Sequence, residues 1–254
     1  MQRILVVALL TGALSASLAA GPIFGTFTVD GSVTVTATGI TWTSNTNVPD
    51  QATISSLGLS GSFVGMANQL VGIHDLTNAP GLQPVNAPFP SFDFIDFIQM
   101  PAYPSLRVNF IPLGSGNPAN CSPNVAAAAG GQTCTLTALT NPPEPGGSPF
   151  TFLNTLNGSG GCCNSSATWN MSGITSDSLS SWNANFVSNF TTSFQQQLLN
   201  FETTGQVSDA FAGALTVNIQ PILAPGPVPE PASFALMGTG LLLLALGYRR
   251  RNKA

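Results

Sequence analysis

Short runs of alternating apolar and hydroxyl-bearing residues recur along most of the chain, separated by clusters of Gly, Pro and Asn. The clearest runs are 24–29 and 32–38, which flank the dipeptide Asp30-Gly31. Period-two alternation predicts strands with one buried and one solvated face. Asp-Gly between two such runs favours a type I′ turn. We therefore expect a β-hairpin here, followed by a third antiparallel strand at 40–43.

Further strand candidates follow at short spacing. They are 52–59, 61–67, 71–76, 91–99, 105–111, 133–139, 150–156, 166–174 and 205–219. Only 180–199 has a mixed period, because Phe186, Phe190 and Phe194 recur every four residues as on a helix face, while Asn and β-branched residues favour strands. A helix and a strand pair both stay open for this segment. Many short strands separated by turn residues predict an all-β body, either an antiparallel β-sandwich or a barrel-like domain.

The N-terminus has the three parts of a secretory signal. Residues 1–3 carry a positive charge, 4–14 are apolar but too short to span a bilayer, and 17–20 include small residues that suit a signal peptidase. We expect a signal peptide over 1–20, cleaved after Ala19 or Ala20. The alternative is an uncleaved N-terminal anchor.

The C-terminus predicts a single transmembrane helix within 232–254. Its first part, 232–248, has 17 residues and no charge, which corresponds to about 25 Å of helix against a hydrocarbon core of ~30 Å. The basic residues that follow are Arg249, Arg250, Arg251 and Lys253. Their stems can snorkel to the interface, and their charge places this end on the cytoplasmic side. A plain unprocessed anchor and a buried core helix are the alternatives.

Between the two ends we expect one extracytoplasmic domain, 21–220, and a Pro-rich spacer, 221–231. Residues 21–226 hold nine carboxylates and a single basic residue, Arg107, which gives a net charge of −8 although the whole chain is at −4. Such a body lacks the positive surface that phosphate contacts need, so nucleic acid is not an expected partner.

Four cysteines lie in the exported part: Cys121, Cys134, Cys162 and Cys163. An even number in an oxidising compartment favours disulfides, and four cysteines allow three pairings. A bond between Cys121 and Cys134 would close a poorly constrained Ala- and Gly-rich loop. The adjacent Cys162 and Cys163 could then pair with each other, but cross-pairing with the first two stays equally open.

No catalytic, metal or cofactor site stands out. The single histidine, His74, precedes Asp75, but no Gly-x-Ser-x-Gly elbow accompanies them. Asp93 and Asp96 would point to opposite faces of a strand, which disfavours a glycosidase pair. Calcium binding by these two residues or by Asp30 is a weaker hypothesis, because no calcium-loop pattern is present. Four aromatic residues could stack on sugar rings if they were exposed: Trp42, Trp169, Trp182 and Tyr103.

The tail carries the most specific motif of the chain. Val228-Pro229-Glu230-Pro231 precedes the apolar helix and the basic terminus. This three-part arrangement resembles the PEP-CTERM sorting signal of Gram-negative bacteria, which exosortases recognise. The resemblance implies processing by an exosortase, an inner-membrane intermediate, and delivery to the cell surface or extracellular matrix. It also implies association with exopolysaccharide and biofilm.

Three functions follow from these observations. The first is a non-enzymatic surface or matrix protein that the tail sorts. The second is a carbohydrate-binding surface module, which would need exposed aromatics in a row. The third, which the sequence favours least, is a secreted hydrolase with clustered acids in a cleft.

Overall fold

The computed structural model describes residues 21–36, 39–77, 84–121, 127–136, 147–158 and 162–219. The expected signal peptide, spacer, sorting motif and C-terminal helix lie outside these residues. Within the described ranges, no helix has both the length and the apolar character that crossing a membrane requires.

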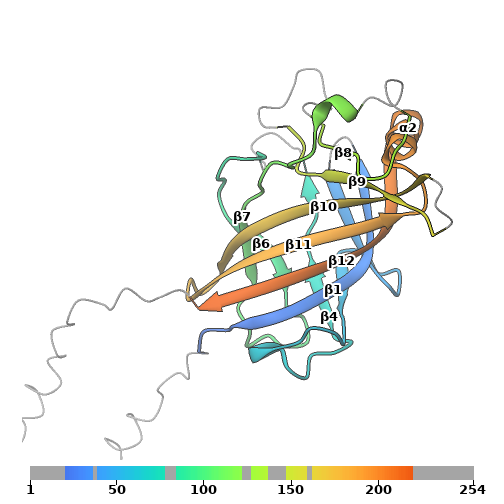
Figure 1. The fold of residues 1–254 in the computed structure, drawn as a ribbon. Helices are drawn as coiled ribbons and strands as arrows, with labels where there is room; N and C mark the ends of the chain where they lie inside the picture. The colour runs from blue at the N-terminus through green and yellow to red at the C-terminus, as the bar shows by residue number, and fades with distance from the viewer. Residues whose placement is uncertain are drawn as a thin grey trace, which may run out of the picture. The chain divides into compact units, whose positions relative to one another are not determined.

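Twelve strands and one regular helix make up the described fold (Figure 1). The strands are β1 Gly25–Thr36, β2 Gly39–Ser44, β3 Gln51–Ile54, β4 Leu70–Ile73, β5 Leu76–Thr77, β6 Phe92–Asp96, β7 Leu106–Phe110, β8 Thr133–Cys134, β9 Thr151–Leu156, β10 Cys162–Thr175, β11 Ser180–Phe190 and β12 Gln206–Ile219. The helix α2 spans Phe194–Thr204, and single 3-10 turns lie at Gly61–Phe63 and Pro118–Asn120.

Eight of the strands form a closed antiparallel barrel in the order β11-β12-β1-β3-β4-β6-β7-β10, and β10 returns to pair with β11. Strands β9 and β8 continue the sheet from β10, while β2 pairs with β1 and β5 pairs with β2. The all-β prediction is confirmed, and of its two alternatives the structure has the barrel. Closure gives each barrel strand two hydrogen-bonded neighbours, which leaves no open edge around the ring.

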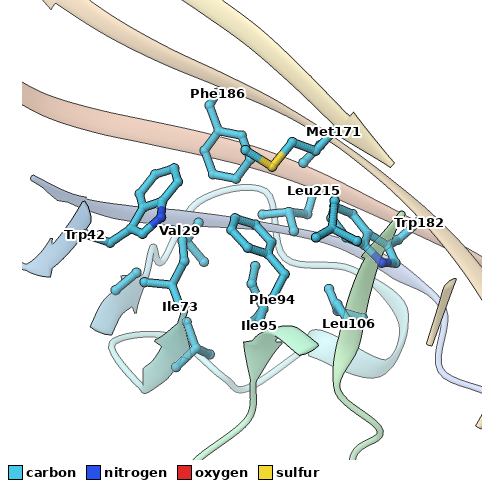
Figure 2. Packing of buried hydrophobic residues seen from close by; sticks show 14 of the residues in the cluster. Val29, Trp42, Ile73, Phe94, Ile95, Leu106, Met171, Trp182, Phe186 and Leu215 are labelled. Carbon is cyan, nitrogen blue, oxygen red and sulfur yellow. The ribbon is translucent and has the colours of Figure 1, made fainter. Parts of the chain in front are cut away.

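Aromatic side chains fill the interior of the barrel (Figure 2). Trp42, Trp169 and Trp182 are at most 2% exposed, and Phe94 and Phe186 are fully buried. These side chains are inward-facing members of the alternating pattern. In β12, for example, the buried residues Phe211, Gly213, Leu215 and Val217 alternate with exposed or half-buried ones. The predicted one-sided alternation therefore describes the barrel wall correctly.

The hairpin predicted at Asp30-Gly31 is wrong, because β1 runs through this dipeptide without a turn. Asp30 and Gly31 pair with Ala212 and Phe211 of β12. A Cβ at position 31 would meet the Thr43 carbonyl oxygen and, at 2.9 Å, the Phe211 ring. Glycine is therefore needed for close approach and not for a turn. At this residue β1 also changes partner from β3 to β2, and the third predicted strand is confirmed as β2.

Two further segments differ from their predictions. In 180–199 the first part is strand β11, and the helix begins only at Phe194, where the Ser193 side chain accepts a hydrogen bond from the Gln196 N–H. It ends at Gly205, whose φ of 76° is left-handed. Residues 61–67 form a 3-10 turn and irregular chain instead of a strand, with Gly61 also at positive φ.

Both ends of the described chain lie at the same end of the barrel. Gly25 at the start of β1 pairs with Val217 near the end of β12. The last residue of β12, Ile219, pairs with Ser180 at the start of β11. Helix α2, which connects β11 to β12, covers the other end (Figure 1). The barrel thus has a terminal end and an α2 end.

Candidate functional site

A cavity of about 60 Å³ lies at the α2 end of the barrel. Its walls come from β1, β9, β10, β11 and β12, and residues of α2 also line it. Five aromatic side chains dominate the lining: Phe150, Phe152, Trp169, Phe190 and Phe201. The volume is several times the ~10–15 Å³ that one water molecule needs. Mouths of β-barrels are common places for small-ligand sites.

One carboxylate, Asp209, also lines this cavity. It occupies an inward position of β12, in the alternating series that continues through Phe211 and Leu215. Burial raises the pKa of the Asp209 carboxyl, although the hydrogen bond that it accepts from the Ala210 N–H at 2.8 Å acts in the opposite direction. An acid at an inward barrel position is the exception in a strand that otherwise contributes apolar residues to the core.

Two residues that line the cavity each have a buried polar atom without a hydrogen-bond partner in the described part of the chain. These atoms are the Oγ of Ser188 and the indole Nε1 of Trp169. Their residues are 2% and 1% exposed. A buried polar atom without a partner is destabilising, and in a native protein it often marks a place where a ligand or water completes the bonding.

The shifted pKa of Asp209 leads to a stability prediction. Because the raised pKa means that the folded state binds a proton more readily than the unfolded state, stability should increase as pH falls through the folded pKa and level off below the ordinary value of about 3.9. Asp209→Asn removes this partly buried charge. We expect this variant to melt at a higher temperature than wild type at about pH 7, with the difference shrinking towards pH 4. Thermal unfolding of both proteins across this range measures it, and a constant difference would contradict the assignment.

A polar network holds α2 over the cavity. The Asn154 Nδ2 donates to Gln195 Oε1 at 2.9 Å, and Asn154 Oδ1 accepts from the Phe194 N–H at 3.0 Å. Gln195 Nε2 in turn donates to Gln132 Oε1 at 2.9 Å. Asn154 is fully buried, so these bonds satisfy its amide and fix the first turn of the helix.

The structure pairs Cys121 with Cys134 and Cys162 with Cys163, which is one of the three pairings that the sequence left open. The Cα atoms of Cys121 and Cys134 are 5.0 Å apart. Both residues pack with Phe194 and Leu198 of α2 in a small cluster. This disulfide therefore supports the α2 end of the barrel.

Replacing Cys121 and Cys134 together by serine should destabilise this end. The bond closes a loop with a sequence separation of 13 residues, for which the loop-entropy model gives about 3 kcal/mol of stabilisation. Urea unfolding of the double variant should show a lower midpoint than wild type. An unchanged midpoint would mean that this bond does not constrain the unfolded chain.

The acidic residues singled out in the sequence are distributed over separate contacts. His74 Nε2 lies 2.7 Å from Asp96 Oδ2, so its ion-pair partner is Asp96 and not the adjacent Asp75. Asp93 forms an ion pair with Arg107 at 3.1 Å. Asp93 and Asp96 thus have different partners and do not converge. In the ranges that the structure describes, no group of three His, Cys, Asp or Glu residues could hold a metal ion.

Asp75 contributes to the fold near Trp42. Its Oδ1 accepts a hydrogen bond from the Trp42 N–H at 3.2 Å. Burial raises the pKa of the Asp75 carboxyl, and the nearby Asp50 carboxyl raises it further. The contacts of Asp75 therefore indicate a structural role.

The aromatic platform that sugar stacking would need does not form from the residues named for it. The three tryptophans are buried in the barrel. Tyr103 is half-buried and donates its hydroxyl to the Ser62 carbonyl oxygen at 2.7 Å. With the three tryptophans buried, these four side chains do not form a row of exposed rings.

Sequence reasoning missed Asp209 and Ser188. Both lie at inward positions of strands that were identified in part, so a signal was available: each is a polar residue at a position where the period-two pattern expects an apolar one. What the pattern could not supply is that β11 and β12 are neighbours, which brings the two residues to one cavity.

The fold and the tail each assign the chain to a class of protein. The described body defines the chain as a closed antiparallel β-barrel protein. Residues 227–251 match the family model of the PEP-CTERM protein-sorting motif, which confirms the resemblance of the tail. This motif implies export through a membrane intermediate to the cell surface, with processing by an exosortase. No curated protein and no solved structure matches the chain.

Proposed function

We propose that the chain is a non-enzymatic surface or extracellular-matrix protein whose barrel is delivered by the sorting tail and then released or transferred by an exosortase. The match of residues 227–251 to the sorting motif carries this proposal. The family resemblance further suggests a place in exopolysaccharide and biofilm. An enzymatic role receives no support from His74, Asp75, Asp93 and Asp96, because each of them has a partner within the fold.

The charge of the body supports a role for the tail in attachment. The only basic residue of 21–226 is Arg107, and it pairs with Asp93. With a net charge of −8, the body is repelled by anionic lipid surfaces. Once the signal peptide is removed, the tail is therefore the segment on which membrane attachment depends. Cleavage near Glu230 would free the whole barrel.

Fractionation of host cells with and without their exosortase tests this proposal. We expect wild-type cells to yield a mature protein at the surface or in the medium that lacks 249–253, as mass mapping of its C-terminus would show. Cells without the exosortase should retain the full tail in the inner membrane. Retention of 249–253 in normal cells would overturn processing.

Variants of the motif sharpen the test. Replacing Pro229, Glu230 and Pro231 by alanine should leave the protein in the membrane fraction. The matched control replaces Pro221 and Pro225, which lie in the spacer but outside the matched segment, and it should be processed as wild type. Equal processing of both sets would remove the motif from the mechanism. Co-purification with exopolysaccharide, lost when the tail is not processed, would test the matrix role.

A further inference from the structure

The terminal end of the barrel carries exposed apolar side chains that no contact within the fold explains. Phe24, Leu57, Val64 and Ile98 lie there, and they are 49%, 74%, 70% and 52% exposed. We propose that this end rests on the apolar region of a lipid surface while the tail holds the protein at the membrane. The inference rests on the proposed anchoring by the tail, and it adds which face of the barrel meets the lipid.

The segments that carry these side chains meet around the start of β1. Residues 55–66 run beside it, and the Ser62 N–H donates to the Phe24 carbonyl oxygen at 2.8 Å. Residues 97–105 connect β6 to β7 at the same end, where the Tyr103 hydroxyl donates to the Ser62 carbonyl oxygen at 2.7 Å. The exposed apolar side chains therefore belong to one end of the barrel, although they come from three separate parts of the sequence.

A buried frame holds two of these side chains in place. Val64 and Ile98 directly follow Phe63 and Phe97, which are 0% and 5% exposed and stack with ring centroids 5.9 Å apart. The Phe63 ring also lies 4.4 Å from that of Phe27 in β1. Because the buried rings fix the neighbouring backbone, Val64 and Ile98 remain at the surface. Side chains on a fixed backbone lose less conformational freedom on binding than those on a mobile loop.

The distribution of charge separates this end from the rest of the acidic body. Residues 21–29, 51–73 and 97–105 contain no Asp, Glu, Lys or Arg. An uncharged surface can approach hydrocarbon without the cost of desolvating an ion. Asp177, in the turn between β10 and β11, is an exposed acid at this end, and the wet headgroup region of a bilayer accommodates it.

The place where the chain leaves the barrel makes lipid the expected occupant. Ile219 ends β12 at the terminal end, and the apolar part of the tail begins at Ala232. An extended chain of this length spans at most about 45 Å. A barrel tethered in this way has a high effective concentration at the bilayer, so weak apolar contacts suffice to orient it. After cleavage the same contacts no longer hold the acidic body on the membrane.

Quenching of added tryptophans by brominated lipid tests the proposal. The protein is recovered from membranes of cells without the exosortase and reconstituted into phosphatidylcholine vesicles with or without bromine on the acyl chains. Bromine quenches tryptophan on contact, and the three native tryptophans are buried, so wild type supplies the background. We expect the fluorescence added by Val64→Trp to fall at least about twofold in brominated vesicles, as for a side chain inserted at the headgroup boundary.

Matched substitutions at the α2 end are the controls. Leu156 stands opposite Cys162, the first residue of β10, and is 64% exposed. The fluorescence added by Leu156→Trp should not respond to bromine. Adding Leu57→Asp to Val64→Trp should weaken the quenching, whereas adding Leu199→Asp, on α2, should leave it unchanged. Near-ultraviolet circular dichroism checks that each variant keeps the wild-type fold.

The outcomes separate this inference from the anchoring on which it rests. If no variant floats with the vesicles, the tail does not anchor, and the anchoring and this inference both fail. If the variants float but Val64→Trp is quenched no more than Leu156→Trp, only this inference is overturned. A signal at position 64 that follows the protein-to-lipid ratio and not bromine would assign the surface to a second copy of the chain, which also overturns the lipid contact.

Discussion

Replacing Gly173 by alanine should prevent the barrel from closing correctly. Gly173 lies in β10, where it pairs with Val108 of β7 on one side and Trp182 of β11 on the other. An added Cβ would overlap the carbonyl oxygen of Arg107 and would stand 2.9 Å from the Trp182 Nε1. Because the first obstacle is backbone, a side-chain rotation cannot relieve it.

The same substitution would also break a partly buried hydrogen bond. The Trp182 indole N–H donates to the Arg107 carbonyl oxygen at 3.0 Å, directly beside Gly173. Steric overlap and the lost bond together should destabilise the protein by at least about 3 kcal/mol. Urea unfolding followed by near-ultraviolet circular dichroism measures the loss.

Gly158→Ala serves as the matched control for Gly173→Ala. A Cβ at Gly158 has no atom within 4 Å and the residue is exposed. Its alanine variant should keep the wild-type unfolding midpoint. If Gly173→Ala were as stable as this control, the tight approach of β7 and β10 would not be a requirement of the fold.

The second large effect is expected for Phe186→Ala. Phe186 is fully buried and packs against Trp42, Trp169 and Phe211, with ring centroids 5.3, 5.4 and 6.0 Å away, respectively. Figure 2 shows its ring inside the barrel near Met171. Truncation should leave a cavity among these rings and destabilise the protein by roughly 3–5 kcal/mol. Unfolding by urea gives this value directly.

The control for Phe186→Ala is Phe24→Ala. Phe24 precedes β1 and is 49% exposed, so its loss removes little buried area and should change the unfolding free energy by well under the core value. Similar losses at both positions would mean that the aromatic cluster does not dominate the stability of the barrel.

The strands could be predicted from the sequence because one-sided burial imposes a period of two. β2, β7 and β12 fall within or next to their predicted ranges. The sorting motif of the tail was predicted from its residues and charges, and the match over 227–251 confirms the motif. Both predictions rest on local pattern, which needs no knowledge of the neighbours in space.

The wrong predictions occur where the conformation of a residue is determined by a contact with a residue distant in sequence. Asp-Gly commonly forms a turn in isolation. In this fold, Gly31 instead lacks a side chain so that the ring of Phe211, 180 positions later, can pack closely against the backbone of β1. The four-residue spacing of Phe186, Phe190 and Phe194 suggested a helix, but the helix begins only at Phe194. Phe186 belongs to strand β11 and packs in the barrel core. The cavity was missed for the same reason, since β1, β10, β11 and β12 meet there only after closure.

The pairing of β1 with β12 sets the order in which this protein can fold. The ladder joins the first strand to the last, from Gly25 opposite Val217 to Thr36 opposite Gln206. Until β12 is available, one long edge of β1 and one of β11 lack their partners, and unpaired edges promote association between chains. Contacts of such sequence separation also form slowly. Ring closure therefore has to wait for β12, the last strand of the barrel along the chain.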